Sequence, residues 1–202
     1  MTRIKLCGLS RPQDIREVNR LKPQWIGFVF APGRRRYVSF QQAKVLKALL
    51  SPEIQAVGVF VREKVETVAG LLNSGIIDLA QLHGGEDEDY IQRLRDLTGK
   101  PIIQALPIAS AQDVLKAEQS VADYILLDSG AGTGTVFDWE LIQNVGRPYF
   151  LAGGLEPRNV EHAVERLHPY AVDVSSGIET DGVKDPNKMA AFVAAVRKED
   201  RL

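Results

Sequence analysis

The chain has 202 residues and a formal net charge of −1, and 45% of its residues are hydrophobic and 25% charged. This balance indicates a globular protein with a sizeable core and excludes a strongly basic protein that binds nucleic acid or a membrane surface. The single cysteine, Cys7, excludes an intrachain disulfide and a cysteine-based zinc site. The first residues lack the apolar core of a secretory signal and no apolar run is long enough to span a membrane, so we expect a cytoplasmic protein.

Short apolar runs rich in β-branched residues recur along the chain and predict strands. In chain order the predicted strands lie within residues 4–8, 25–30, 54–61, 76–84, 101–108, 122–130, 148–154 and 171–177. Stretches with apolar residues at i, i+3, i+4 and i+7 follow most of these runs and predict helices. The predicted helices lie within residues 11–21, 39–50, 63–75, 87–99, 110–119, 156–167 and 186–198, and residues 137–146 hold at most a short helix.

Alternation of strand and helix predicts βαβ units and therefore a parallel sheet. Eight such units in 202 residues favour a closed (β/α)₈ TIM barrel near the small end of its size range. A doubly wound open sheet is the alternative. No linker or low-complexity tract divides the chain, so we expect one α/β barrel domain over residues 1–202.

Side-chain parity within the predicted strands separates apolar faces from faces that carry polar residues. The apolar faces suit contact with the surrounding helices, and the other faces are expected to point into the barrel. The polar residues on these inner faces are Lys5, Cys7, Gln81, His83, Asp128 and Asp173. Residues at the ends of their strands are then expected at the carboxyl-terminal mouth of the barrel, where barrel enzymes have their active sites.

Cys7 ends the first predicted strand and is a candidate base or nucleophile. A thiol has an ordinary pKa of about 8.5, which nearby cations lower. Lys5 shares the inner face with Cys7 and is such a cation. An inert, packed thiol is the alternative interpretation.

Asp128 ends the sixth predicted strand and is a candidate general acid. The alternative is a carboxylate that only binds loop amides. The glycine-rich segment GAGTG, residues 130–134, has the spacing G-x-G-x-G rather than the G-x-G-x-x-G of a dinucleotide site. This spacing favours a flexible loop over the barrel mouth.

Glycine-rich segments end the seventh and eighth predicted strands. Barrels often bind phosphate there, because glycine lets backbone N–H groups approach the anion and serine hydroxyls add donors. The candidate phosphate-binding residues are Gly153, Gly154, Ser175, Ser176 and Gly177. Two tight turns without a ligand are the alternative.

Three consecutive arginines, Arg34 to Arg36, follow the second predicted strand. A guanidinium binds carboxylate or phosphate through two parallel hydrogen bonds, but we expect two of the three to be solvated loop cations. His83 is a candidate for polarising a substrate or orienting a neighbouring group, and a neutral histidine packed into the barrel rim is the alternative. Lys5 and Asp173 lie on strands that adjoin in a closed barrel, so we expect them to form an ion pair inside it.

Several segments resemble motifs of the phosphoribosylanthranilate isomerase family. They are KLCGL, GFVFAPGRRRYVS, VGVFV, QLHGGE, LLDSGAGTGTVFDW, LAGGLEPRNV and VDVSSGIETDGVKDPNKM. The resemblance runs in order from about residue 3 to residue 198. It departs at Arg34, where the family usually has serine.

This resemblance implies an isomerase of tryptophan biosynthesis. The reaction is the Amadori rearrangement of N-(5′-phosphoribosyl)anthranilate to 1-(2-carboxyphenylamino)-1-deoxyribulose 5-phosphate, without metal or cofactor. The resemblance further implies a phosphorylated small-molecule substrate. From the net charge of −1 we expect no nucleic-acid or membrane partner, and the oligomeric state is left open as a monomer or homodimer.

The resemblance also implies residue roles. Cys7 would be the general base, Asp128 the general acid, and Arg36 the ligand of the anthranilate carboxylate. It implies that the glycine- and serine-rich strand ends bind the phosphate and that Asp173 lies near the sugar. Another barrel enzyme acting on a sugar phosphate, such as indoleglycerol-phosphate synthase or a histidine-pathway isomerase, is the alternative, and a barrel that only binds a phosphorylated ligand is a further one.

Overall fold

The computed structural model describes residues 1–128 and 139–198. Eight parallel strands close into a barrel, in which each strand pairs with its sequence neighbours and the last strand pairs with the first. The strands are β1 (Arg3–Cys7), β2 (Trp25–Val29), β3 (Gln55–Phe60), β4 (Leu79–Leu82), β5 (Ile102–Pro107), β6 (Tyr124–Asp128), β7 (Tyr149–Leu151) and β8 (Ala171–Val174). The predicted (β/α)₈ barrel is confirmed, and the open-sheet alternative is wrong.

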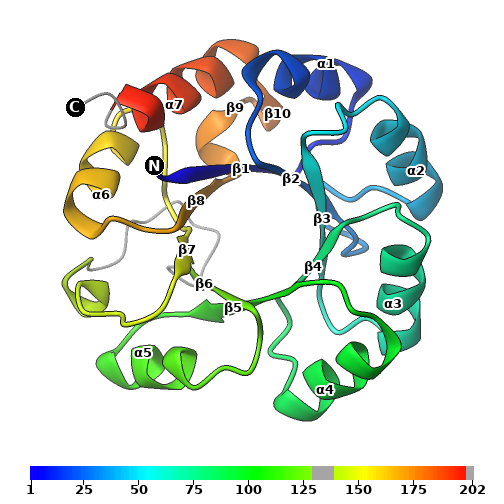
Figure 1. The fold of residues 1–202 in the computed structure, drawn as a ribbon. Helices are drawn as coiled ribbons and strands as arrows, with labels where there is room; N and C mark the ends of the chain where they lie inside the picture. Colours follow the sequence, from blue (N-terminus) through cyan, green and yellow to red (C-terminus); the bar gives the residue numbers. More distant parts are fainter. Residues whose placement is uncertain (129–138, 199–202) are drawn as a thin grey trace.

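Helices surround the strands in a continuous outer ring (Figure 1). They are α1 (Pro12–Leu21), α2 (Phe40–Ala48), α3 (Val65–Asn73), α4 (Glu88–Leu97), α5 (Ala111–Glu118), α6 (Val160–Leu167) and α7 (Pro186–Lys198). Between β6 and β7 the described residues form only the short 3₁₀ helix η1 (Trp139–Ile142), as predicted for this segment. Ser39 and Asp87 cap α2 and α4 by accepting backbone N–H groups of the first turn, which fixes where these helices begin.

The helix α6 begins at Val160, four residues later than predicted. The reason is Asn159, whose side chain accepts a hydrogen bond from the backbone N–H of Glu156 (2.8 Å) and donates one to the carbonyl of Gly154 (2.9 Å). These bonds hold residues 154–159 in a turn that competes with the first turn of a helix.

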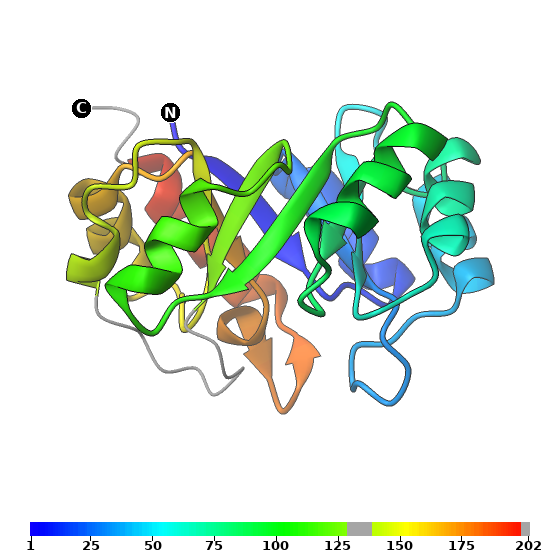
Figure 2. The same cartoon turned by 90° about the horizontal axis from the view of Figure 1, so that it is seen from below.

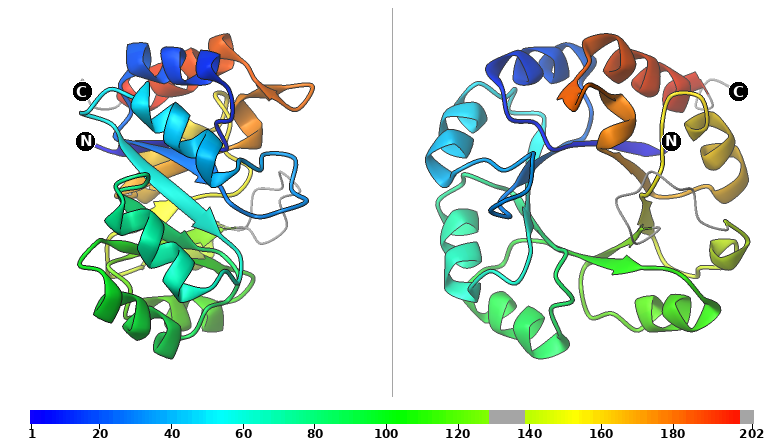
Figure 3. Two further views of the ribbon diagram at one scale, coloured as in Figure 1. Left: turned by 90° about the vertical axis from the view of Figure 1, so that its right-hand side faces the viewer. Right: turned by 180° about the vertical axis from the view of Figure 1, so that it is seen from behind.

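The segment after β8 contains elements that the sequence pattern did not predict. The 3₁₀ helix η2 (Ser176–Ile178) leads into an antiparallel hairpin of β9 (Glu179–Thr180) and β10 (Val183–Lys184). Strands of two residues are too short to show a hydrophobic period. In Figures 2 and 3 this hairpin and the β2–α2 connection project from the same end of the barrel, opposite the first residue of the chain.

Apolar side chains form two layers on either side of the strands. The layer inside the barrel consists of Trp25, Val57, Leu79, Ile103, Ala105, Leu126, Phe150, Ala152 and Ala171. A larger layer between strands and helices contains the opposite strand faces, including Ile4, Leu6 and Ile125. The predicted strand parity is confirmed, because Lys5, Gln81 and Asp173 lie on the inner faces and are buried.

Within the described ranges, no helix is long and apolar enough to cross a membrane.

Candidate active site

A buried ion pair joins the first and last strands inside the barrel. Lys5 pairs in register with Asp173, and Lys5 Nζ lies 2.9 Å from Asp173 Oδ1. Burial by itself lowers the pKa of Lys5, but Asp173 and Cys7 outweigh it, and the pKa of Lys5 rises overall. The predicted ion pair is confirmed. It links the first and last strands of the barrel beneath the mouth.

Cys7 lies at the carboxyl end of β1, and only 7% of it is exposed. It pairs with Gly27 on β2, where an added Cβ would come within 2.6 Å of the Cys7 Sγ. Gly27 therefore provides the space that the thiol occupies, a requirement that no sequence pattern indicated. Burial raises the pKa of the Cys7 thiol, and the cations Lys5 and Lys184 only partly oppose this rise.

The expected lowering of the Cys7 pKa by Lys5 is therefore not the net result in the unliganded protein. Lys5 does favour the thiolate, but desolvation of a buried thiolate is the larger effect. Lys5 also binds Asp173, whose negative charge raises the thiol pKa further. Lys5 by itself therefore does not lower the pKa of Cys7 below its ordinary value.

Asp128 lies at the carboxyl end of β6 and adjoins His83, which follows β4. His83 Nε2 is 3.5 Å from Asp128 Oδ2, and His83 Nδ1 is 3.2 Å from Gln81 Nε2. The His83 ring therefore lies between the Gln81 amide and the Asp128 carboxyl group. Its role in orienting a neighbouring group stays a prediction.

The glycine-rich ends of β7 and β8 lie side by side at the mouth. Gly153 and Gly154 both have positive φ, at 88° and 65°. The backbone of Gly177 packs so closely on Leu155 that an added Cβ would lie 1.9 Å from the Leu155 carbonyl oxygen. The candidate phosphate-binding segments thus adjoin at the contact between Gly177 and Leu155, and phosphate binding there stays a prediction.

Ser175 connects these segments to β1, because its hydroxyl donates to the carbonyl of Cys7 (3.2 Å). Its backbone carbonyl in turn accepts a hydrogen bond from Lys184 Nζ (2.8 Å). The predicted base and one candidate phosphate ligand therefore belong to the same hydrogen-bonded group.

Arg36 extends over the mouth from the β2–α2 connection and binds a carboxylate of the chain itself. Glu179 accepts two hydrogen bonds from Arg36 and one from Arg35. As expected, two of the three arginines, Arg34 and Arg35, are exposed, although Arg35 also binds Glu179. Glu179 and Lys184 lie within the sequence motifs, but the sequence pattern did not indicate them as site residues. The hairpin that brings them together has strands of only two residues each.

The candidate loop at residues 130–134 lies outside the described residues, as does the whole segment 129–138.

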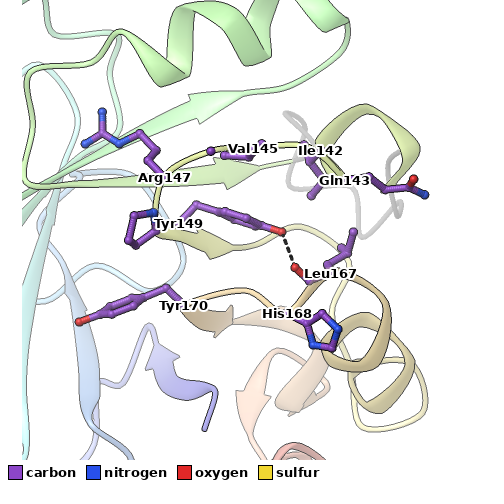
Figure 4. A pocket seen from close by; sticks show the side chains of 10 residues that line it. Ile142, Gln143, Val145, Arg147, Tyr149, Leu167, His168 and Tyr170 are labelled. Atoms are coloured by element: carbon purple, nitrogen blue, oxygen red, sulfur yellow. Dashed lines mark hydrogen bonds between the residues drawn. The ribbon is translucent and has the colours of Figure 1, made fainter.

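A cavity of about 340 Å³ lies at the other end of the barrel, where β7 and β8 begin (Figure 4). Its polar side chains bind the surrounding backbone: the Tyr149 hydroxyl donates to the carbonyl of Leu167, and Arg147 donates to the carbonyls of Ser120 and Ala122. The cavity is far from Cys7 and Asp128 along the barrel, so it does not belong to the candidate site.

Comparison with known proteins identifies the family. The model of the family described as N-(5′-phosphoribosyl)anthranilate (PRA) isomerase matches residues 4–195. The chain belongs to the phosphoribosylanthranilate isomerase family. A curated family member from Endomicrobium trichonymphae is 44% identical over 202 residues, which cover 98% of this chain and 99% of that protein.

Solved family members agree with the barrel over nearly its whole length. A phosphoribosylanthranilate isomerase from Thermotoga maritima has a TM-score of 0.90 and 32% identity, with 98% of this chain and 100% of that chain covered. A second solved member, in complex with reduced 1-(o-carboxyphenylamino)-1-deoxyribulose 5-phosphate, has a TM-score of 0.88, 32% identity and the same coverage. The chain is accordingly an isomerase of tryptophan biosynthesis.

Proposed function

We propose that the barrel mouth catalyses the Amadori rearrangement of N-(5′-phosphoribosyl)anthranilate, with Cys7 as general base and Asp128 as general acid. The observation that carries the proposal is the placement of the two groups. They end β1 and β6, which are separated around the barrel by β7 and β8 and the candidate phosphate-binding surface. A ribose held by its phosphate at that surface would lie between them.

The reaction begins at the ribose ring. Asp128 in its acid form donates a proton to the ring oxygen, the bond from this oxygen to C1′ breaks, and the nitrogen lone pair forms the C1′=N⁺ iminium. His83 is placed to orient the carboxyl group of Asp128, with the two side chains 3.5 Å apart. Positioned acids and bases of this kind contribute about 10²- to 10⁴-fold in rate.

Proton removal from C2′ follows. Cys7 first releases its thiol proton to solvent, and the resulting thiolate takes the C2′ proton. The C2′–H electrons form the C1′=C2′ double bond, and the iminium π electrons return to nitrogen. The resulting enolamine tautomerises to the ketone. Burial raises the pKa of Cys7, and the iminium cation next to C2′ offsets this effect because an opposite charge favours the thiolate.

The remaining residues bind the two anionic ends of the substrate. We assign the phosphate to Gly153, Gly154, Ser175, Ser176 and Gly177, supported by the contact at which their two segments adjoin. Arg36 binds the anthranilate carboxylate. Asp173 lies near the sugar, and its contact with Lys5 supports a mainly structural role for it.

The cellular location, the domain organisation and the oligomeric state of the enzyme stay predictions. We expect a cytoplasmic enzyme of one domain over residues 1–202, acting as a monomer or homodimer on a phosphorylated small molecule. One solved relative consists of monomers generated from a dimeric isomerase of Thermotoga maritima, and another relative is in complex with reduced 1-(o-carboxyphenylamino)-1-deoxyribulose 5-phosphate.

Two variants test the proposed chemistry. Cys7→Ala and Asp128→Asn should each lower kcat by about 10²- to 10⁴-fold, because each removes one proton-transfer group. The fluorescence of anthranilate derivatives makes turnover of freshly prepared phosphoribosylanthranilate simple to follow. Affinity for inorganic phosphate, measured by calorimetry, should stay unchanged in both variants.

Glu53→Gln is the matched control, since the Glu53 side chain is exposed and forms a surface ion pair with Lys22, at 3.9 Å. Its turnover should equal that of the wild type. Near-wild-type kcat in both Cys7→Ala and Asp128→Asn would overturn the assigned acid and base.

A further inference from the structure

The β9–β10 hairpin after β8 brings one carboxylate to the edge of the candidate site. Within the hairpin, Glu179 on β9 pairs in register with Lys184 on β10. Glu179 and Lys184 are both buried, although the hairpin projects from the barrel. The barrel itself closes through β1 to β8 without these strands, so the buried charges need an explanation other than barrel closure.

Glu179 accepts four charge-assisted hydrogen bonds from three cations. Its Oε1 binds Arg36 Nε and Lys184 Nζ, each at 2.6 Å. Its Oε2 binds Arg36 Nη2 at 2.9 Å and Arg35 Nη2 at 2.6 Å. Burial by itself raises the pKa of Glu179, but the bonds from Arg36 and Lys184 outweigh it and lower this pKa overall, so the group is a carboxylate.

The bonds to Arg36 fix the orientation of its guanidinium. Glu179 accepts hydrogen bonds from Nε and Nη2 of Arg36, and two such bonds fix the plane of the guanidinium. The third guanidinium nitrogen, Nη1, makes no hydrogen bond to Glu179. The arginine stem also packs on Gly8, where an added Cβ would lie 2.5 Å from Arg36 Cδ. Gly8 directly follows Cys7, so the oriented guanidinium is held next to the proposed base.

We infer that Glu179 is a positioning residue: it holds Arg36 so that the guanidinium recognises a carboxylate on the substrate's aromatic amine. This inference rests on the proposed role of Arg36. A flexible arginine has to be ordered when the ligand binds, whereas an arginine already held by Glu179 is preorganised for a second carboxylate. Glu179 therefore determines the preference for an ortho-carboxylated aniline over aniline itself.

A pair of stable ligands separates this role from a general structural one. The first is reduced 1-(o-carboxyphenylamino)-1-deoxyribulose 5-phosphate, and the second is the same compound without the carboxylate. Calorimetry gives Kd for both ligands in the wild type and in Glu179→Gln. The substitution should weaken binding of the carboxylated ligand by about tenfold, the scale of a hydrogen bond to a charged group, and leave the other ligand within about twofold.

Arg36→Ala and the double variant Arg36→Ala/Glu179→Gln complete a cycle. Arg36→Ala should remove the preference for the carboxylated ligand, and adding Glu179→Gln should change neither Kd further, because Glu179 acts through Arg36. Glu66→Gln is the control, because Glu66 forms an exposed ion pair with Arg93 on the helix side of the barrel. The Kd of this variant for each of the two ligands should equal that of the wild type.

The outcomes distinguish the inference from the function on which it rests. If Arg36→Ala keeps the preference, the proposed role of Arg36 is wrong, and the positioning role falls with it. If Arg36→Ala loses the preference but Glu179→Gln keeps it, or if Glu179→Gln weakens both ligands equally, the role of Glu179 alone is overturned.

A second substitution covers the case that Glu179→Gln does not fold. Glu179→Asp keeps the negative charge beside the three cations but shortens the side chain by one methylene. It should reduce the preference for the carboxylated ligand only partly. An unchanged preference in a folded Glu179→Asp protein, together with unfolded Glu179→Gln, would assign Glu179 to stability and overturn the inference.

Discussion

At the amino-terminal end of the barrel four aromatic rings fill the interior, whereas polar and charged side chains occupy the carboxyl-terminal end. The rings of Trp25, Tyr124, Phe150 and Tyr170 contact one another with centroids 5.0 to 6.2 Å apart. At the other end the buried groups are ionic, and they are ordered by hydrogen bonds. The same eight strands thus contribute packing at one end and reactive groups at the other.

The difference between the two ends has a physical cause. Aromatic packing stabilises the fold without regard to precise hydrogen-bond geometry, because burial of apolar area is not directional. Buried charges give little net stability, since their desolvation offsets their attraction. Lys5 and Asp173 lie between the two regions. We therefore expect substitutions on the aromatic side of this pair to affect stability, and substitutions on the other side to affect catalysis.

The largest effect on stability is expected from Phe150→Ala. Phe150 is fully buried and touches Trp25, Tyr124 and Tyr170, so its loss should lower the free energy of unfolding by about 3–5 kcal/mol. Urea unfolding measures this change, and kcat of the folded protein at low temperature should stay near the wild-type value. Leu115→Ala, at an exposed helix position, is the control. A loss below about 1 kcal/mol would show that the aromatic end is not the stabilising end.

Breaking the ion pair between the two ends should have the next largest effect. Lys5→Met leaves Asp173 buried without its cation and should lower the free energy of unfolding by about 3 kcal/mol. The double variant Lys5→Met/Asp173→Leu removes both charges and should recover most of this loss. If the double variant is less stable than Lys5→Met, the pair does not act as a compensated unit.

The pH dependence of the Lys5 contribution follows from its raised pKa. A cation whose pKa is higher in the folded than in the unfolded protein contributes its full stability below the unfolded value. This stability should be lost as the pH rises above about 10.5, through the folded pKa. The stability difference between wild type and Lys5→Met should therefore decrease in urea unfolding series that are carried out at increasing pH above about 10.5.

The smallest effect concerns the ionisation of the thiol. Cys7 is the single cysteine of the chain, so the difference in thiolate absorbance between wild type and Cys7→Ala reports on it alone. Its midpoint should lie above the ordinary value of about 8.5, because burial raises the pKa. Lys184→Met should raise it further, since Lys184 favours the thiolate. Lys47→Met, whose ammonium pairs with Asp78, should leave it unchanged, and a midpoint below the ordinary value would contradict the role of burial.

Much of the site was predictable because it depends on strand order and parity. The alternation of strand and helix indicated the closed barrel, and the inner faces identified the ends that carry Cys7 and Asp128. The pair of Lys5 and Asp173 followed from closure, because the first and last strands of a barrel adjoin. These relations are local or topological, so a single sequence contains them.

The contacts of Arg36 were not predictable in the same way. Its partner Glu179 is 143 residues away and lies in a hairpin whose strands have only two residues each. The net rise of the Cys7 pKa depends on burial, which a neighbouring lysine in the sequence does not reveal.

The barrel and the residues at the ends of its strands, including the proposed catalytic groups, could thus be predicted from the amino-acid sequence. The tertiary structure decided which charges meet and which are desolvated, including the attachment of Arg36 to Glu179 and the space that Gly27 leaves for the thiol. The reason is that periodicity fixes the direction of a side chain along its own strand. Pairing and desolvation are fixed only when distant segments pack together.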